Sequence, residues 1–288
     1  MTSRQVRVSG KSEKKVTPSH TSSQNPPNNN GDSEEVIHIN EFKLEDIPLS
    51  CTFIMVGPPG SGKSSFMKDI LYYRKHVYPV ARCFAGTQNM YEDLKEICGP
   101  LYVTYGYNEQ YLTSTCRRLV KCNEDKKKGL CQNPYMITIV DDCTDDPQTL
   151  KSNLFRAIYK KGSQHWPQCF LLGLHVPSDS AMDIRTSTSY VAIGRQPEPA
   201  LRKRLYDCFG GTCGTFARFN ALMDELTSDH TFLIIKKRSD SNNIEDCVFY
   251  YTTHKELPKY KFGCKEYRQH NDERYDSNYD ESGHETII

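Results

Sequence analysis

The sequence predicts an α/β fold: a three-layer sandwich with a mostly parallel central sheet and a β-hairpin at one edge. Three observations support it. Short β-branched or aromatic runs alternate with segments of helical apolar spacing, which is typical of a parallel sheet covered by helices on both faces. A glycine-rich octapeptide lies between one such run and one such helical segment. The length of 288 residues suits one domain of this kind with tails.

The individual elements follow from the apolar runs in chain order. Strands are expected at 51–56, 80–85, 101–105, 136–141, 169–174, 189–193, 231–236 and 247–252. Helices are expected between them at 64–75, 89–97, 108–122 and 147–161. Because a polar loop joins the last two strands, we expect them to form the hairpin at the sheet edge.

Both ends of the chain differ in composition from the middle. Residues 1–35 are rich in Ser, Asn, Pro, Lys and Gln and have almost no large apolar side chain. Such a segment does not repay the entropy of ordering, so a disordered amino-terminal arm is expected over 1–35. The folded domain is expected over 36–264. Residues 265–288 are polar and acidic and are expected to form a second disordered tail.

Charge and cysteine content exclude several classes of protein. With 37 basic and 36 acidic residues the net charge is +1, so any DNA-binding surface must be local. No apolar run approaches the ~18 residues of a membrane span, and the polar start does not resemble a signal peptide. A soluble, non-secreted protein is expected.

The 12 cysteines include no C-x-x-C pair, which favours reduced thiols packing as small hydrophobes over a structural metal site.

The octapeptide Gly57–Ser64 reads GPPGSGKS and matches the phosphate-binding pattern G-x-x-x-x-G-K-[ST] completely. The apolar strand 51–56 before it and the helix 64–75 after it supply the context that this motif needs. The sequence therefore predicts binding of a nucleoside triphosphate. The residues expected to contact it are Gly57, Pro58, Pro59, Gly60, Ser61, Gly62, Lys63, Ser64 and the helix-start residue Ser65.

Each residue type in this loop has a chemical reason. The glycines let the backbone take positive φ and bring N–H groups close to the β-phosphate, and the helix that begins at Lys63 adds its dipole. Lys63 is placed to reach the β- and γ-phosphates. The Ser64 hydroxyl is placed to bind Mg²⁺.

A second chemical signal is the apolar strand 136–141, which ends in the carboxylate pair Asp141 and Asp142. An aspartate at the carboxyl end of a sheet strand can hold the Mg²⁺ shell, and this role is assigned to Asp141. Asp142 is the candidate general base for the attacking water. A kinase-like enzyme is the alternative at this point, and it would need an arginine-rich lid, for which only 202–204 is available.

A third stretch carries a resemblance to a known family. It comprises the segment 155–166, the strand 169–174, His175 and the segment 183–191, followed later by 216–229. This order resembles the genome-packaging ATPases of nucleocytoplasmic large DNA viruses, the poxvirus-type members of the FtsK-HerA superfamily of P-loop NTPases. In that family paired acids end one strand, a Gly-Arg-His-like turn precedes the next, a polar sensor ends it, and an arginine precedes the fifth strand.

The resemblance covers roughly residues 36–255 and departs from the family pattern at two places. Where the family has Gly-Arg-His, this chain has Gly-Ser-Gln-His, so only His165 carries over. Where the family sensor is usually glutamine, His175 stands. The resemblance makes Arg185 the first candidate for an arginine that acts on a neighbouring subunit, with Arg156 and Arg195 behind it.

The resemblance implies an ATP- and Mg²⁺-dependent motor that forms a homo-oligomeric ring, grips double-stranded DNA and packages it into a viral capsid, in the host cytoplasm or the virion. Candidate DNA-contacting groups are Lys126, Lys127 and Lys128 and the basic amino-terminal arm, although such runs are commonly only solvated. A helicase or DNA-transfer motor of the same superfamily would share every motif. A nucleotide-gated switch with little turnover is the third alternative.

Overall fold

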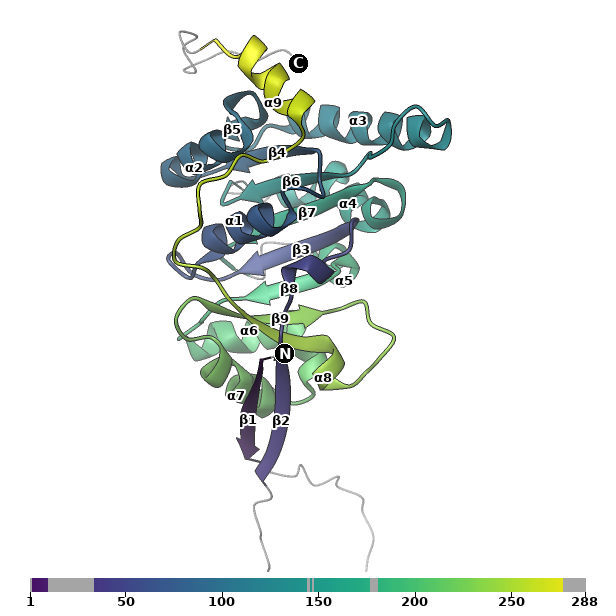
Figure 1. The fold of residues 1–288 in the computed structure, drawn as a ribbon. Coiled ribbons are helices and arrows are strands. Elements are labelled where there is room, and N and C mark those ends of the chain that lie inside the picture. Colours follow the sequence, from purple (N-terminus) through teal and green to yellow (C-terminus); the bar gives the residue numbers. More distant parts are fainter. Residues whose placement is uncertain (1, 10–33, 144–145, 147, 177–180, 277–288) are drawn as a thin grey trace, which may run out of the picture.

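Ten strands form one sheet in the part of the chain that the structure describes (Figure 1). The structure is a computed structural model that describes residues 2–9, 34–143, 146, 148–176 and 181–276. Its six central strands run parallel in the order β8-β3-β7-β6-β4-β5. Their bounds are β3 Cys51–Val56, β4 Val80–Ala85, β5 Val103–Tyr105, β6 Met136–Asp141, β7 Gln168–Leu174 and β8 Tyr190–Ile193. The predicted mostly parallel sheet is confirmed.

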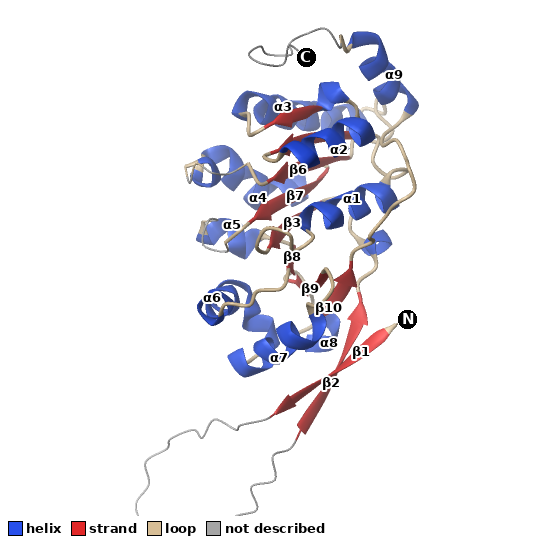
Figure 2. Ribbon diagram, turned by 90° about the vertical axis from the view of Figure 1, so that its left-hand side faces the viewer, coloured by secondary structure: helices blue, strands red, loops and turns tan. Residues whose placement is uncertain are grey.

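Helices cover both faces of this sheet, as Figure 2 shows. One face carries α1 Lys63–Arg74 and α2 Gln88–Cys98. The other carries α3 Glu109–Lys127, α4 Asn153–His165, α5 Met182–Ser187, α6 Pro199–Phe209 and α7 Phe216–Leu226. Each face has its own apolar core, so the three-layer prediction is confirmed. No helix in the described ranges is long and apolar enough to span a bilayer.

The amino-terminal arm corrects one expectation. Ser3–Ser9 forms β1, which pairs antiparallel with β2 Glu34–Glu41, although all of residues 1–35 were expected to be disordered. Val6 and Val8 alternate with polar residues and are buried on the side of the sheet that α7 covers. Two valines at a spacing of two suffice because the remaining core is supplied by distant parts of the chain. Residues 10–33 lie outside the described part.

The hairpin that was expected at the edge of the sheet lies inside the sheet. β9 Thr231–Lys236 and β10 Val248–Thr252 pair antiparallel, as predicted, but β10 also pairs in parallel with β2. The edge is therefore β1, and the sheet order on this side is β1-β2-β10-β9-β8. Residues 244–247 form the short helix α8 Ile244–Cys247 before β10 begins. The predicted edge position of the hairpin was wrong because β1 and β2, from the amino-terminal end of the chain, extend the sheet beyond β10.

The carboxyl end is also ordered further than expected. Lys265–Arg274 forms helix α9, and Tyr267 stacks on Tyr102 with ring centroids 3.9 Å apart. Asn271 Oδ1 accepts a hydrogen bond from the backbone N–H of Leu101 at 3.1 Å. The expectation of disorder from residue 265 is therefore wrong as far as residue 276. Aromatic burial repays the ordering entropy of a segment whose average composition is polar.

Strand order sets the position of the chemistry. β7 lies between β3 and β6, and the three strands are parallel. The segments that follow these strands therefore emerge side by side at the carboxyl ends of the strands. They are Gly57–Ser64, His175 and Asp142. The carboxyl ends of the strands are the place where open α/β sheets bind ligands.

Candidate nucleotide-binding site

The phosphate loop, Gly57–Ser64, joins β3 to α1 in a tight arch. Gly60 and Gly62 have φ of 75° and 96°, a region that only glycine enters at low cost. Gly62 is the N-cap of α1, and its carbonyl accepts the first helical hydrogen bond, from Phe66 N–H at 2.9 Å. A Cβ on Gly57 would lie 2.6 Å from Ser61 Oγ. The backbone conformation and the close packing at these positions therefore explain why the loop has glycines there.

Lys63 is buried at the mouth of this loop, with 7% of its surface exposed. Its ammonium donates to the carbonyl oxygens of Gly57 at 2.7 Å and Pro58 at 3.3 Å. Burial lowers the pKa of Lys63, while the charges of Asp141 and Asp142 raise it. A cation held by two neutral carbonyls and facing two carboxylates can exchange these acceptors for phosphate oxygens.

Ser64 and Asp141 face one another as the assignment of Mg²⁺ ligands requires. Ser64 Oγ donates to Asp141 Oδ2 at 2.8 Å. Asp141 is 2% exposed, and its other oxygen, Oδ1, is buried without a hydrogen-bond partner. Burial raises the pKa of Asp141, and the Ser64 hydrogen bond and Lys63 oppose this. An orphaned carboxylate oxygen beside a hydroxyl fits an oxygen-ligated divalent cation, so these residues could hold Mg²⁺.

Asp142 turns sharply away from β6. Its φ is 53°, and its carboxylate forms an ion pair with His175 Nε2 from the end of β7. The other ring nitrogen of His175, Nδ1, lies 3.5 Å from Lys63 Nζ. A Cβ on Gly86 would lie only 1.6 Å from the Asp142 carbonyl oxygen, so this turn depends on a glycine at the end of β4. The structure thus brings together three predicted residues: Lys63, Asp142 and His175.

Arg185 does not belong to the site of its own chain. It lies on α5, and Ser189 shortly after it is hydrogen-bonded to Thr52 near the start of β3. This is the edge of the sheet opposite the phosphate loop. The role expected for Arg185, action on a neighbouring subunit, stays a prediction. Arg156 is close to Asp183 at 3.6 Å, and the side chain of His165 lies outside the described part.

Sequence reasoning missed one feature of the site. Asp229 and His230, just before β9, both have positive φ, at 47° and 55°. With Asp142 they are the non-glycine residues of the described chain that do so, and such strained positions concentrate at functional sites. A Cβ on Gly62 would lie 3.2 Å from His230 Nδ1. Nothing in the short polar sequence before β9 signals a contact with a loop more than 150 residues away.

The fold and the geometry of the phosphate loop define a P-loop NTPase. The genome packaging NTPase B204 of Sulfolobus turreted icosahedral virus 2 has a similar fold, with a TM-score of 0.50, 12% identity, 72% of this chain and 99% of B204 covered. No family model matches the sequence.

Two relatives come from iridescent viruses. Uncharacterized protein 088R of Invertebrate iridescent virus 3 is 33% identical over 217 residues, which is 74% of this chain and 81% of 088R. Uncharacterized protein 075L of Invertebrate iridescent virus 6 is 27% identical over 78% of this chain and 86% of 075L. The chain belongs to the same family as 088R.

Proposed function

We propose that this chain is an ATPase that translocates double-stranded DNA and packages a viral genome into the capsid, as a homo-oligomeric ring. One observation carries the proposal: Asp141 and Asp142 stand beside the phosphate loop, with Asp142 joined to Lys63 through His175. A binding-only switch does not need a second carboxylate there. The description of B204 as a packaging NTPase and the viral origin of the relatives support the biological setting.

The chain's own residues account for the steps of hydrolysis. Backbone N–H groups of the phosphate loop and the Lys63 ammonium bind the β- and γ-phosphates. Bound Mg²⁺ would draw charge from the phosphate oxygens, and Ser64 and Asp141 would hold it. The attacking water loses its proton to the Asp142 carboxylate as the new P–O bond forms and the bond to the ADP oxygen breaks. His175 orients that carboxylate.

The proposal assigns two further roles to residues outside this site. Arg185 would act on the nucleotide of the adjacent subunit, where a guanidinium stabilises transition-state charge. Lys126, Lys127 and Lys128 are exposed at the end of α3, and Arg7 is exposed on β1. These cations would contact DNA phosphates without reading sequence. Capsid components would be the further partners, in the host cytoplasm or the virion.

The test is the steady-state rate of ATP hydrolysis with and without double-stranded DNA, across protein concentration. An assembled motor is stimulated by DNA and by concentration. Lys63→Ala should lose nucleotide binding, while Asp142→Asn should bind ATP and lose turnover by roughly 10²–10⁴-fold. Leu130→Ala, at a side chain that is 76% exposed, is the control and should change neither. Rates indifferent to both DNA and concentration would reject the motor in favour of a switch, and strand separation would indicate a helicase.

A further inference from the structure

A pocket of about 610 Å³ lies between α3 and α9, where β4 and β6 begin. Tyr102 and Tyr267, whose rings stack on one another, line it together with Met136, the first residue of β6. The phosphate loop follows the opposite end of the parallel strand β3, so the pocket is separate from the nucleotide site. Its volume is typical of sites for small molecules, about 300–1,000 Å³.

The pocket exists because β5 is short. β5 pairs only with the second half of β4, which is Cys83, Phe84 and Ala85. Residues 80–82, in the first half of β4, have no strand on this side. Tyr267 of α9 donates instead to the carbonyl of Ala81 at 3.2 Å. Side chains of α3 and α9 therefore cover the start of β4 and leave space between them.

Two arginines bring positive charge to this space. Arg82 is 5% exposed, and its guanidinium donates to the carbonyl of Leu101 at 2.9 Å and to Thr104 Oγ1 at 3.3 Å. Arg118 of α3 is exposed, and its Nη1 lies 3.9 Å from the sulfur of Met136. Neither guanidinium forms an ion pair with a carboxylate in the described ranges. Positive charge beside apolar surface attracts an anion more strongly than the same charge in water.

Both charges act on the interior of the pocket. Burial lowers the pKa of Arg82. Burial raises the pKa of Tyr102, and the charges of Arg118 and Arg82 oppose this effect. Among the described lining residues Glu266 is the only carboxylate, and it lies in the first turn of α9. Hydrogen bonds from its own backbone N–H and from the Cys264 side chain lower its pKa, so its partners are in its own turn.

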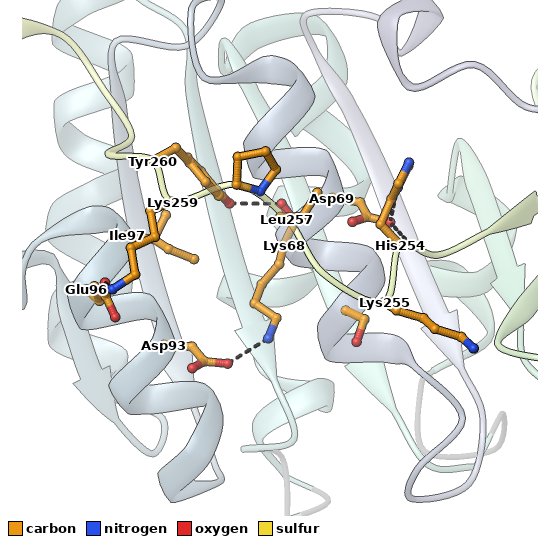
Figure 3. Close-up of a pocket in the computed structure, with 12 residues that line it drawn as sticks. Lys68, Asp69, Asp93, Glu96, Ile97, His254, Lys255, Leu257, Lys259 and Tyr260 are labelled. Carbon is orange, nitrogen blue, oxygen red and sulfur yellow. Dashed lines mark hydrogen bonds and ion pairs between the residues drawn. The ribbon is translucent and has the colours of Figure 1, made fainter.

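A smaller pocket, of about 210 Å³, provides a contrast (Figure 3). It lies between α1, α2 and the segment 253–264, and lysines and carboxylates occur side by side in its lining. Lys68 pairs there with Asp93 at 2.6 Å. Asp69 is buried and accepts from the backbone N–H of His254 at 3.0 Å. Charges of both signs have partners within the chain in that pocket, so it does not favour an anion.

We propose that the pocket between α3 and α9 binds a small organic acid, whose carboxylate pairs with Arg118 and whose apolar body packs against Met136 and Tyr102. An aromatic body fits best, because a guanidinium, a thioether and a phenol ring all pack favourably on aromatic rings. Arg82 acts through its charge alone, since its nitrogen atoms are buried or already bonded. The inference goes beyond the proposed function and does not depend on nucleotide binding.

The test measures binding of 2-naphthoate and of 2-naphthamide to the full chain by calorimetry. The probes share one ring system, and only the first carries a charge. Naphthoate should bind about tenfold more tightly than naphthamide, which is the size of one charge-assisted hydrogen bond. Arg118→Gln should remove this difference and leave naphthamide binding within about twofold of the parent value.

Two further variants complete the experiment. Arg117→Gln is the matched control, because Arg117 is an exposed arginine of the same helix that does not line the pocket. It should bind both probes as the parent does. Ser114→Trp places a large side chain at an exposed lining position and should block both probes.

Four outcomes would overturn the assignment. One is the absence of naphthoate binding at millimolar concentration, and another is equal affinity for naphthoate and naphthamide. Unchanged naphthoate binding by Arg118→Gln, or equal weakening by Arg117→Gln, would show that the charge of Arg118 in the pocket is not what binds the acid. Unchanged binding of both probes by Ser114→Trp would place them outside the pocket.

Discussion

Gly173→Ala tests whether the site depends on the space that a glycine leaves beside Asp141. The two residues are directly opposite on the parallel strands β6 and β7. A Cβ on Gly173 would lie 2.2 Å from Asp141 Oδ1 and 3.1 Å from Met67 Cε. Real Cβ contacts essentially never fall below 3.0 Å, so the carboxylate oxygen must move by at least about 0.8 Å.

The surroundings turn this small shift into a large effect on rate. Asp141 and Met67 are both fully packed, so the carboxylate cannot relax toward Met67. Ser64 donates to the other oxygen of the same carboxylate, Oδ2, at 2.8 Å, so displacement of the group also disturbs this hydrogen bond. Misplacement of a catalytic group by about 1 Å can cost ~10²-fold in rate. We therefore expect kcat for ATP hydrolysis to fall by roughly 10²-fold.

The assay is ATP hydrolysis over a Mg²⁺ titration, with tripolyphosphate binding and thermal unfolding measured on the same samples. The variant should need more Mg²⁺ for half-maximal rate and should still bind tripolyphosphate through Lys63. Gly211→Ala is the control, because a Cβ there meets nothing within 4 Å. A folded Gly173→Ala protein with kcat and Mg²⁺ dependence within threefold of the parent would refute the reasoning.

Three further predictions follow from the same site. Gly86→Ala should displace the Asp142 turn and lower kcat by about 10²-fold with ATP binding retained; a normal rate in single-turnover assays would contradict this. Burial raises the pKa of Asp141, so ionising this carboxyl lowers the stability of the folded protein as pH rises from the ordinary pKa of 3.8 through the raised pKa. Asp141→Asn should therefore be at least as stable to urea at pH 7 as the parent, and this advantage should be absent below pH 3.8. A variant less stable than the parent at pH 7 would count against the burial argument. Arg185→Ala and Lys63→Ala should each be inactive, and mixing the two variants should restore ATPase activity. In a mixed ring the intact phosphate loop of one subunit then meets the intact Arg185 of its neighbour. No recovery in a mixed ring would exclude a role of Arg185 in trans.

The central sheet was predictable because its strands are buried on both faces. The runs 51–56, 80–85 and 136–141 agree with β3, β4 and β6 at both ends. Continuous apolar segments of this kind need no tertiary information. β1 and α9 were missed for the opposite reason. Each buries only a few side chains, such as Val6 and Tyr267, against elements supplied by distant parts of the chain.

The phosphate loop, the strand and helix that flank it, and the carboxylate pair at 141–142 could all be predicted from local sequence, because the loop motif needs its glycines and the carboxylates end a continuous apolar run. Which groups meet the loop depends on the tertiary structure. His175 reaches Asp142 and Lys63 because β7 lies between β3 and β6, and Asp69 becomes a buried acceptor because segment 253–264 crosses α1. Strand order and chain crossings depend on long-range packing, which no local pattern encodes.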